Sequence, residues 1–338
     1  MHDYRIAIVG GSGFIGSALA DSLSKSFDVR IVDKRRPAVG SRIDFTECDI
    51  RIHDDLKRAL EGVDLAINTA IVQIPQINEN SWLGYGVNVV GTQNLCEIVR
   101  NSASLRGLIL AGTWHTIGEK HLNGVIDERF GFRPDMVEDR ARIYALSKIA
   151  QESIVRLYDE AFADKIYGVI RIGTVLGLNM PEKTAARIFI DQAIMGRTLT
   201  PYDYSLYRPM LYVDIRDACR AFESYASMIL NNSLRKKENS LADIVNVYYP
   251  KPMTILELAE TVAETVLSIT NGQIKPEITV VRTGQAPQFA PEDKDKIEIN
   301  VSRALDFLGL KKLTSPAEAI REIIEKRITS LHSVDSLA

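Results

Sequence analysis

Short apolar runs alternate with amphipathic segments along the first half of the chain. The apolar runs are rich in valine, isoleucine and leucine and are predicted as strands: Arg5–Val9, Val29–Val32, Leu65–Asn68, Gly107–Leu110 and Gly168–Arg171. The segments between them repeat apolar residues at helical spacing, in Ile15–Lys25, His53–Leu60, Gly86–Asn101 and Ile143–Phe162. Mainly apolar strands that alternate with helices are typical of a parallel sheet covered by helices on both faces.

This alternation ends after Arg171. Loops that contain proline and glycine follow, such as GLNMPEK and LTPYDYSLYRP, and the later elements are shorter and mixed. We therefore predict an α/β fold in two parts. A doubly wound parallel sheet occupies residues 1–176, and a smaller mixed α/β region occupies residues 177–330, with some of its elements returning to the first domain.

A cluster of glycines joins the first predicted strand to the first predicted helix. Gly10, Gly13 and Gly16 form the pattern G-x-x-G-x-x-G. The first allows a tight turn, the second lets the backbone approach a pyrophosphate, and the third lets helix and strand pack closely. Although a tight turn alone also needs glycine, this position between strand and helix predicts a Rossmann-type sheet that binds a dinucleotide.

An acidic residue ends the second predicted strand. Asp33 stands 23 positions after Gly10, where a carboxylate accepts the ribose hydroxyls and repels a 2′-phosphate. This favours NAD over NADP as the cofactor. Arg35 and Arg36 point the other way, since they could bind a 2′-phosphate; the alternative is that they are solvated basic residues in a loop.

A tyrosine and a lysine lie one helical turn apart in IYALSKIAQE. Tyr144 and Lys148 share one face of the predicted helix. A free phenol has a pKa of about 10, too high for a base at neutral pH, but a nearby ammonium and a positively charged cofactor ring both favour the phenolate. The pair is therefore predicted to be catalytic, although Y-x-x-x-K also occurs often by chance.

With these motifs the chain resembles the extended short-chain dehydrogenase/reductase superfamily, in the NAD-dependent epimerase/dehydratase branch to which UDP-glucose 4-epimerase belongs. The resemblance covers nearly the whole chain. VGGSGFIGS is similar to the glycine motif of that branch, with Val9 where a threonine is usual. Later motifs of the branch are similar to ECDIR, INTA, NVVGTQNLCE, LAGTWHTIG, RIGTVLG and LYVDIRDA.

The resemblance implies the residues of the site. Those that would hold the cofactor are Gly10, Gly13, Phe14, Ile15, Gly16, Asp33, Asp49, Ile50, Thr69, Ala70, Asn88, Tyr144 and Lys148. Asn88 is also implied as a structural or proton-relay residue. Thr113 takes the position of the catalytic serine or threonine, so the implied catalytic residues are Thr113, Tyr144 and Lys148.

The reaction implied by the resemblance is hydride transfer. Tyr144 would take the proton from a substrate hydroxyl, Thr113 would hydrogen-bond the same oxygen, and Lys148 would hold the nicotinamide ribose and lower the pKa of Tyr144. NAD would accept the hydride, giving a keto-sugar. In an epimerase the ketone then turns and takes the hydride on its other face, so no cofactor is consumed.

Two positions depart from the pattern of the branch. Its dehydratases and decarboxylases carry acidic residues after the catalytic serine or threonine, whereas this chain has Trp114 and His115. A dehydratase is therefore less favoured. His115 is expected to contact the substrate; it could itself be an acid or a base, or a loop histidine that only packs nearby.

Cations for the substrate are expected in the second, substrate-binding region. Arg208 and Arg282 resemble the arginines that bind the diphosphate of a nucleotide-sugar. The alternative for each is a surface ion pair. The tyrosines of TPYDYSLYRP could stack on the nucleotide base.

Composition and charge bear on the partners and the compartment expected for the protein. The chain has 338 residues, a net charge of −3 and three widely spaced cysteines. This charge does not point to nucleic acid or a membrane as a partner. An odd number of separated cysteines suggests no metal site and favours a reducing compartment. No apolar stretch is long enough for a membrane span and no signal peptide is expected, so we predict a cytoplasmic protein.

The combined prediction is an NAD-dependent nucleotide-sugar epimerase that forms a homodimer. Gly86–Asn101 and Ile143–Phe162 carry more apolar positions than one sheet face needs, and in the resembled family such helices form a four-helix interface. The alternatives are an NAD(P)-dependent dehydrogenase or reductase for another alcohol or ketone, a nucleotide-sugar dehydratase, and a catalytically silent NAD-binding sensor. The presence of the whole trio Thr113, Tyr144 and Lys148 argues against the sensor.

Overall fold

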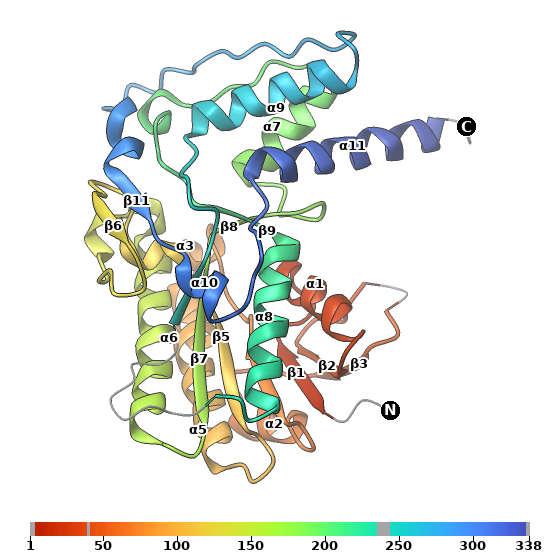
Figure 1. Ribbon diagram of the computed structural model, residues 1–338, viewed down its shortest axis with the longest axis vertical. Helices are drawn as coiled ribbons and strands as arrows, with labels where there is room; N and C mark the ends of the chain where they lie inside the picture. Colours follow the sequence, from red (N-terminus) through yellow and green to blue (C-terminus); the bar gives the residue numbers. More distant parts are fainter. Residues whose placement is uncertain (1–3, 39–40, 235–243, 336–338) are drawn as a thin grey trace.

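A sheet of seven parallel strands forms the centre of the molecule (Figure 1). The computed structural model describes residues 4–38, 41–234 and 244–335. In spatial order the strands are β10 (Ile244–Val247), β7 (Ile166–Ile172), β5 (Gly107–Thr113), β4 (Leu65–Asn68), β1 (Arg5–Val9), β2 (Asp28–Asp33) and β3 (Asp44–Glu47). The predicted doubly wound sheet is confirmed. Its order reverses between β1 and β4, which is where such sheets bind ligands.

Helices cover both faces of this sheet. One face is covered by α2 (His53–Ala59), α5 (Gly91–Asn101) and α6 (Arg142–Ala161), and the other by α1 (Phe14–Leu23) and α8 (Ile215–Leu230). Side chains of β1 alternate between the two cores: Ile6 and Ile8 pack on the side of α1 and α8, whereas Ala7 and Val9 pack on the side of α5 and α6. All four are buried, which explains why the strand sequence is apolar throughout.

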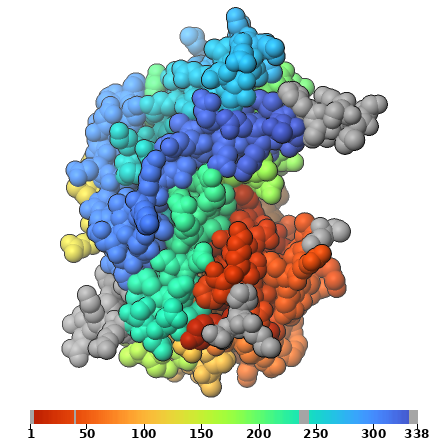
Figure 2. Space-filling view, turned by 45° about the vertical axis from the view of Figure 1, so that its right-hand side comes forward, coloured from red at the N-terminus to blue at the C-terminus, as the bar shows by residue number. Residues whose placement is uncertain are grey.

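The second region lies beyond the carboxyl ends of the strands. It contains α7 (Ala185–Ile194), α9 (Ile255–Ile269) and α11 (Pro316–Asp335). Two of its strands pair in parallel with short strands of the first 176 residues: β9 (Tyr212–Asp214) with β8 (Thr174–Leu176), and β11 (Ile297–Ile299) with β6 (Gly124–Ile126). The remaining short helices are α3 (Gln76–Glu79), α4 (Ser81–Tyr85) and α10 (Ser302–Asp306). Figure 2 shows α11 lying across the upper half of the molecule, above the N-terminal residues.

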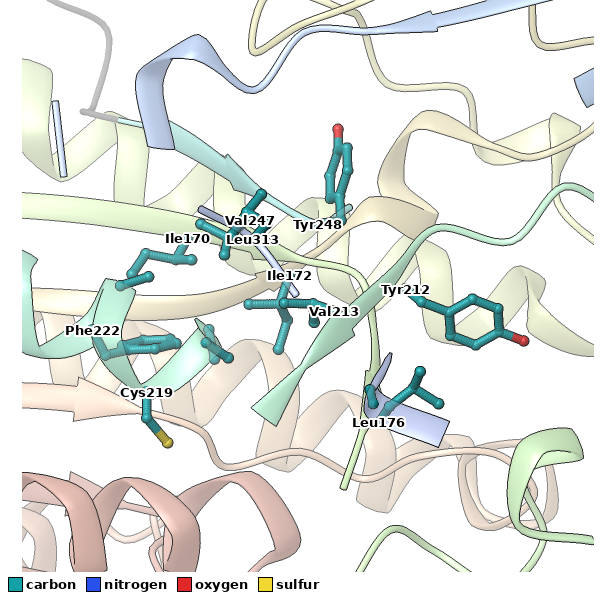
Figure 3. Packing of buried hydrophobic residues seen from close by; sticks show 14 of the residues in the cluster. Ile170, Ile172, Leu176, Tyr212, Val213, Cys219, Phe222, Val247, Tyr248 and Leu313 are labelled. Carbon is teal, nitrogen blue, oxygen red and sulfur yellow. The ribbon is translucent and has the colours of Figure 1, made fainter. Parts of the chain in front are cut away.

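One continuous apolar core joins the sheet to the second region (Figure 3). Ile170 and Ile172 of β7 belong to the same core as Phe222 of α8, Val213 of β9 and Leu313 near the C-terminus. The second region is therefore anchored on the sheet by apolar packing.

Three elements differ from the sequence-based expectations. β3 was not predicted. The helix expected at Gly86–Asn101 begins with a π-helical turn, Gly86–Val90, and becomes α-helical at Gly91. β10 was not predicted as a strand, and it pairs with β7 as the edge strand of the large sheet.

None of the helices in the described residues is long and apolar enough to cross a bilayer.

Candidate active site

A groove of about 370 Å³ lies over the carboxyl ends of β1 and β2. The predicted cofactor residues that line it are Gly10, Gly13, Asp33, Asp49, Ile50, Thr69 and Ala70. They come from four separate segments of the sequence, and the fold brings them together at the point where the strand order reverses.

The glycine turn at this groove has no room for side chains. Gly10 has φ +83°, and a Cβ on it would lie 2.5 Å from the backbone nitrogen of Ala70. A Cβ on Gly16 would lie 2.3 Å from the Gly10 carbonyl oxygen. Gly13 caps α1 without a side-chain acceptor, so N–H groups of the first helical turn remain available to an anion. The bare turn and open helix end fit a pyrophosphate.

Acidic residues stand at the far end of the groove. Asp33 accepts hydrogen bonds from the backbone N–H groups of Ser12 at 3.0 Å and Arg35 at 2.9 Å. Each carboxylate oxygen keeps a free acceptor site, which suits ribose hydroxyls. A hydrogen bond from Arg51 holds the pKa of Asp49 well below its usual range, against its partial burial. Both carboxylates are therefore anchored and remain exposed to the groove.

A second cavity, of about 230 Å³, adjoins the groove and shares Thr69 and Ile71 with it. Its predicted site residues are Phe14, Ile15, Thr69, Thr113, His115, Tyr144 and Lys148. Thr113 ends β5, Tyr144 and Lys148 lie on α6, and Phe14 begins α1. The structure thus brings the three predicted catalytic residues together beside the proposed cofactor groove.

Burial changes the proton affinity of both residues on α6. It lowers the pKa of Lys148 to about 7, against the opposing charge of Glu152. The Lys148 ammonium donates a 2.6 Å hydrogen bond to the Ala111 carbonyl. Burial raises the pKa of Tyr144 to about 12, and a hydrogen bond with Thr113 opposes this rise. Tyr144 therefore holds its proton at neutral pH until a further charge stabilises the phenolate.

Thr113 lies between Tyr144 and His115. Its Oγ1 is 3.2 Å from His115 Nδ1 and accepts the backbone N–H of His115 at 3.3 Å. The imidazole meets the Tyr144 ring edge to face, with 5.9 Å between ring centres. Trp114 is fully buried, with 4.5 Å between its ring centre and that of the imidazole.

Asn88 is buried outside the walls of both cavities. Its amide pairs with both backbone groups of Val72, at 2.7 and 3.1 Å, and donates to Ser147 Oγ at 3.0 Å. It therefore ties the loop after β4 to α6, on the turn before Lys148.

The two predicted substrate arginines lie in different surroundings. Arg208 is 5% exposed and ion-paired with Glu119 at 2.8 Å and Glu138 at 3.1 Å. Arg282 is exposed, directly after Val281, which bridges to Tyr202. Neither arginine lines the catalytic cavity.

Three polar residues of the cavity wall were not predicted: Gln73, Thr174 and Thr184. Thr174 lies within RIGTVLG and accepts the indole N–H of Trp114 at 3.2 Å, so that motif carried a signal for it. Gln73 and Thr184 lie in loop and cap positions that have no sequence signal of their own.

Comparisons with known proteins show which family the chain matches. Residues 6–232 match the model of the NAD dependent epimerase/dehydratase family. The dTDP-6-deoxy-L-talose 4-dehydrogenase (NAD(P)(+)) of Kitasatospora kifunensis is 26% identical over 329 residues, which cover 94% of each chain.

Two solved structures share the fold. MoeE5 in complex with UDP-glucose and NAD has a TM-score of 0.75 and 21% identity, covering 97% of this chain and 99% of its own. The UDP-glucose 4-epimerase of Thermus thermophilus in complex with NAD has a TM-score of 0.71 and 22% identity, covering 95% and 98%. Since the family match spans well over half of the 338 residues, the chain belongs to the NAD dependent epimerase/dehydratase family and is an NAD-dependent enzyme.

Proposed function

We propose that this protein is a nucleotide-sugar epimerase. The observation that carries the proposal is the meeting of Thr113, Tyr144 and Lys148 in one cavity that adjoins the dinucleotide groove. A nucleotide-sugar is the proposed substrate class because the similar MoeE5 structure is described in complex with UDP-glucose.

The proposed reaction moves one proton and one hydride in each direction. Bound NAD would supply a hydride acceptor for the substrate carbon and a positive charge beside Tyr144. Tyr144 accepts the hydroxyl proton as that C–O bond becomes a carbonyl, and Thr113 hydrogen-bonds the same oxygen. Lys148 holds the cofactor ribose, and the Ala111 carbonyl fixes the direction of its ammonium. Return of the hydride to the opposite face of the carbon, and of the proton from Tyr144 to the substrate oxygen, would give the epimer.

Interconversion of UDP-glucose and UDP-galactose tests the proposal. We expect the purified protein with NAD to form UDP-galactose, detected by proton NMR. Tyr144→Phe should lower turnover by about 10²–10⁴-fold, because general base catalysis is typically worth that much. It should leave NAD binding and the melting temperature nearly unchanged, since only one hydroxyl is removed.

Tyr4→Phe is a matched control. Tyr4 packs under Arg106 at the opposite end of the sheet, and a phenylalanine keeps that contact. Wild-type turnover in Tyr144→Phe would refute the hydride-transfer assignment.

We further propose that Arg282 and two stacked tyrosines bind the nucleotide. Tyr202 and Tyr204 stack at 5.9 Å with 16° between their rings, and Tyr202 is half exposed. Asp203 between them accepts from Thr283, the neighbour of Arg282. This cluster offers a ring face for a base and a cation for a phosphate.

The second candidate is a net dehydrogenase whose substrate lacks a diphosphate. The engagement of Arg208 by Glu119 and Glu138 favours it, because one of the two predicted phosphate cations is already neutralised. Cofactor behaviour separates the two candidates: an epimerase retains NAD during purification and accumulates no NADH, whereas a dehydrogenase releases NADH with each turnover.

A homodimer in the cytoplasm is the proposed working form. Val90, Leu146 and Leu157, on the turn before α5 and on α6, are 50%, 41% and 60% exposed, which fits contact with a second copy. The three cysteines are buried and unpaired, which fits a reducing compartment.

A further inference from the structure

We propose that His115 sets the direction of the hydrogen bonds around Thr113. Its imidazole carries a proton on Nδ1 and donates a hydrogen bond to Thr113 Oγ1. The single Thr113 hydroxyl proton is then donated to the Tyr144 oxygen in the free protein, and is shared between the Tyr144 and substrate oxygens when substrate is bound. His115 is thus a positioning residue for the reaction. The inference rests on the proposed function, because it concerns how Tyr144 loses and regains its proton.

Thr113 Oγ1 has three polar neighbours in the structure. The His115 backbone N–H lies at 3.3 Å, the His115 Nδ1 at 3.2 Å, and the Tyr144 hydroxyl shares a hydrogen bond with it. A hydroxyl offers one proton and two acceptor sites. The backbone N–H uses one acceptor site, which leaves one proton and one acceptor site for Nδ1 and the tyrosine oxygen.

With a neutral imidazole, only two placements of the protons allow Thr113 Oγ1 to hydrogen-bond both His115 Nδ1 and the Tyr144 oxygen. With the histidine proton on Nδ1, the imidazole donates to Thr113 and Thr113 donates to Tyr144. With that proton on Nε2, Thr113 must donate to Nδ1, and Tyr144 can then only donate to Thr113. The first arrangement stabilises a phenolate and the second requires the neutral phenol. Loss of a proton from Tyr144 therefore needs the first.

Burial keeps the imidazole neutral, so the position of a single proton decides the direction of the hydrogen bonds. Burial lowers the pKa of His115 to about 4. The Glu119 and Glu138 carboxylates act against this, and the Arg208 and Arg140 guanidiniums act with it. Arg208 contacts both glutamates and Arg140 contacts Glu138, so the two negative charges beside the ring are balanced.

The backbone around His115 holds the ring in place. Thr113 is the N-cap of a 3-10 turn, Trp114–Ile117, and this turn folds the imidazole back onto the threonine that precedes it. Trp114 packs against the ring with 4.5 Å between centres. Glu119, just after the turn, accepts the Glu138 N–H at 3.0 Å, which ties this segment to the chain leading into α6.

The tautomer can be measured directly by ¹⁵N NMR of protein labelled at its histidine rings. The chain has five histidines, and His115→Asn identifies the signal of interest. We expect a neutral ring with its proton on Nδ1 at pH 7. A proton on Nε2, or a charged ring, would overturn the proposal. This measurement needs neither substrate nor cofactor, so its result stands even if the proposed epimerase activity fails.

Two variants test the consequence for turnover with UDP-glucose as the probe. His115→Ala removes the donor to Thr113, and we expect kcat to fall about tenfold with little change in the dissociation constant of NAD. His115→Asn places an amide N–H near the position of Nδ1, and we expect it to restore kcat to within about threefold of the wild type. Equal losses in the two variants, or no loss in either, would contradict the positioning role.

His121→Asn is the matched control. His121 is exposed, outside both cavities, and has φ +52°, a conformation that asparagine adopts readily. It should leave kcat unchanged.

Discussion

Lys148 is buried, and among the described residues a single backbone carbonyl, that of Ala111, accepts a hydrogen bond from its ammonium. Burial of this kind disfavours the charged form of a lysine, which is why its pKa falls to about 7 despite the nearby Glu152. The charged and neutral forms of Lys148 are therefore close in free energy at neutral pH, and a bound partner can stabilise the charged form. Protonation of Lys148 should also be coupled to folding.

The stability of the protein should depend on pH through Lys148. An unfolded lysine titrates near 10.4, so between about pH 7 and 10 the unfolded chain binds a proton that the folded chain does not. The free energy of unfolding contributed by this residue then rises with pH, by up to about 1.4 kcal/mol per pH unit. Urea unfolding of wild type and Lys148→Met between about pH 7 and 9 should show this rise in the wild type alone. The exposed Lys25→Met is the control, and a parallel pH trend in wild type and Lys148→Met would disprove the coupling.

Asp33 should determine the choice of cofactor. Asp33→Ala removes the carboxylate that faces the ribose end of the groove, beside Arg35. We expect NAD to bind about tenfold or more weakly, and the preference for NAD over NADP to shrink. Calorimetric titration with both cofactors measures this. Asp28→Ala, at the other end of β2, should leave both affinities unchanged. Tighter binding of NADP than of NAD by the wild type would refute the assignment.

At the scale of elements, the β1–α1 turn depends on close contact between backbones. Gly16→Ala adds a Cβ that would lie 2.3 Å from the Gly10 carbonyl and 2.7 Å from the Gly11 Cα, both on backbone that cannot rotate away. We expect α1 to shift, the free energy of unfolding to fall by about 1–3 kcal/mol, and NAD binding to weaken. Gly131→Ala, where a Cβ meets nothing within 4 Å, should change neither. Chemical unfolding measures the free energy of unfolding of both variants, and titration measures their affinity for NAD. Equal values for the two variants would contradict the prediction.

Elements with strong local patterns could be predicted and elements set by their neighbours could not. The predicted ends of Arg5–Val9 and Leu65–Asn68 agree with the structure because a buried parallel strand is apolar and stops at a turn or polar residue. β3 has the sequence DFTE and sits half exposed at the sheet edge, so it lacks that pattern. β10 is only four residues long, and its place beside β7 follows from packing across the molecule.

The same division holds in the site. The positions of Tyr144 and Lys148 relative to each other follow from helix periodicity, and the resemblance supplied Thr113. The partners of Arg208 could not be predicted, because Glu119 and Glu138 are far from it in sequence and meet it only in the folded chain. The contact between His115 and Thr113 depends on a short 3-10 turn that one sequence does not reveal.

At the scale of the molecule, the proposed dimer should be measurable and breakable. Light scattering at micromolar concentration should give twice the mass of the chain. Replacing Leu146 and Leu157 together by aspartate puts charges on an exposed apolar face of α6 and should yield monomers. Leu267→Asp, on α9, carries the same charge on a similarly exposed leucine outside that face and is the control. A monomeric wild type would rule out the dimer.

The place of β10 at the sheet edge has a consequence for how the chain is made. During synthesis β7 leaves the ribosome well before α8 and β10, because these two elements begin at Ile215 and Ile244. Before α8 has been synthesised, Ile170 and Ile172 are not packed against Phe222 on their face of the sheet. We expect the first 176 residues alone to associate through this bare face. The segment proposed to bind the substrate is then also the segment that completes the sheet, so residues up to 247 have to be synthesised before the sheet of the earlier half is complete.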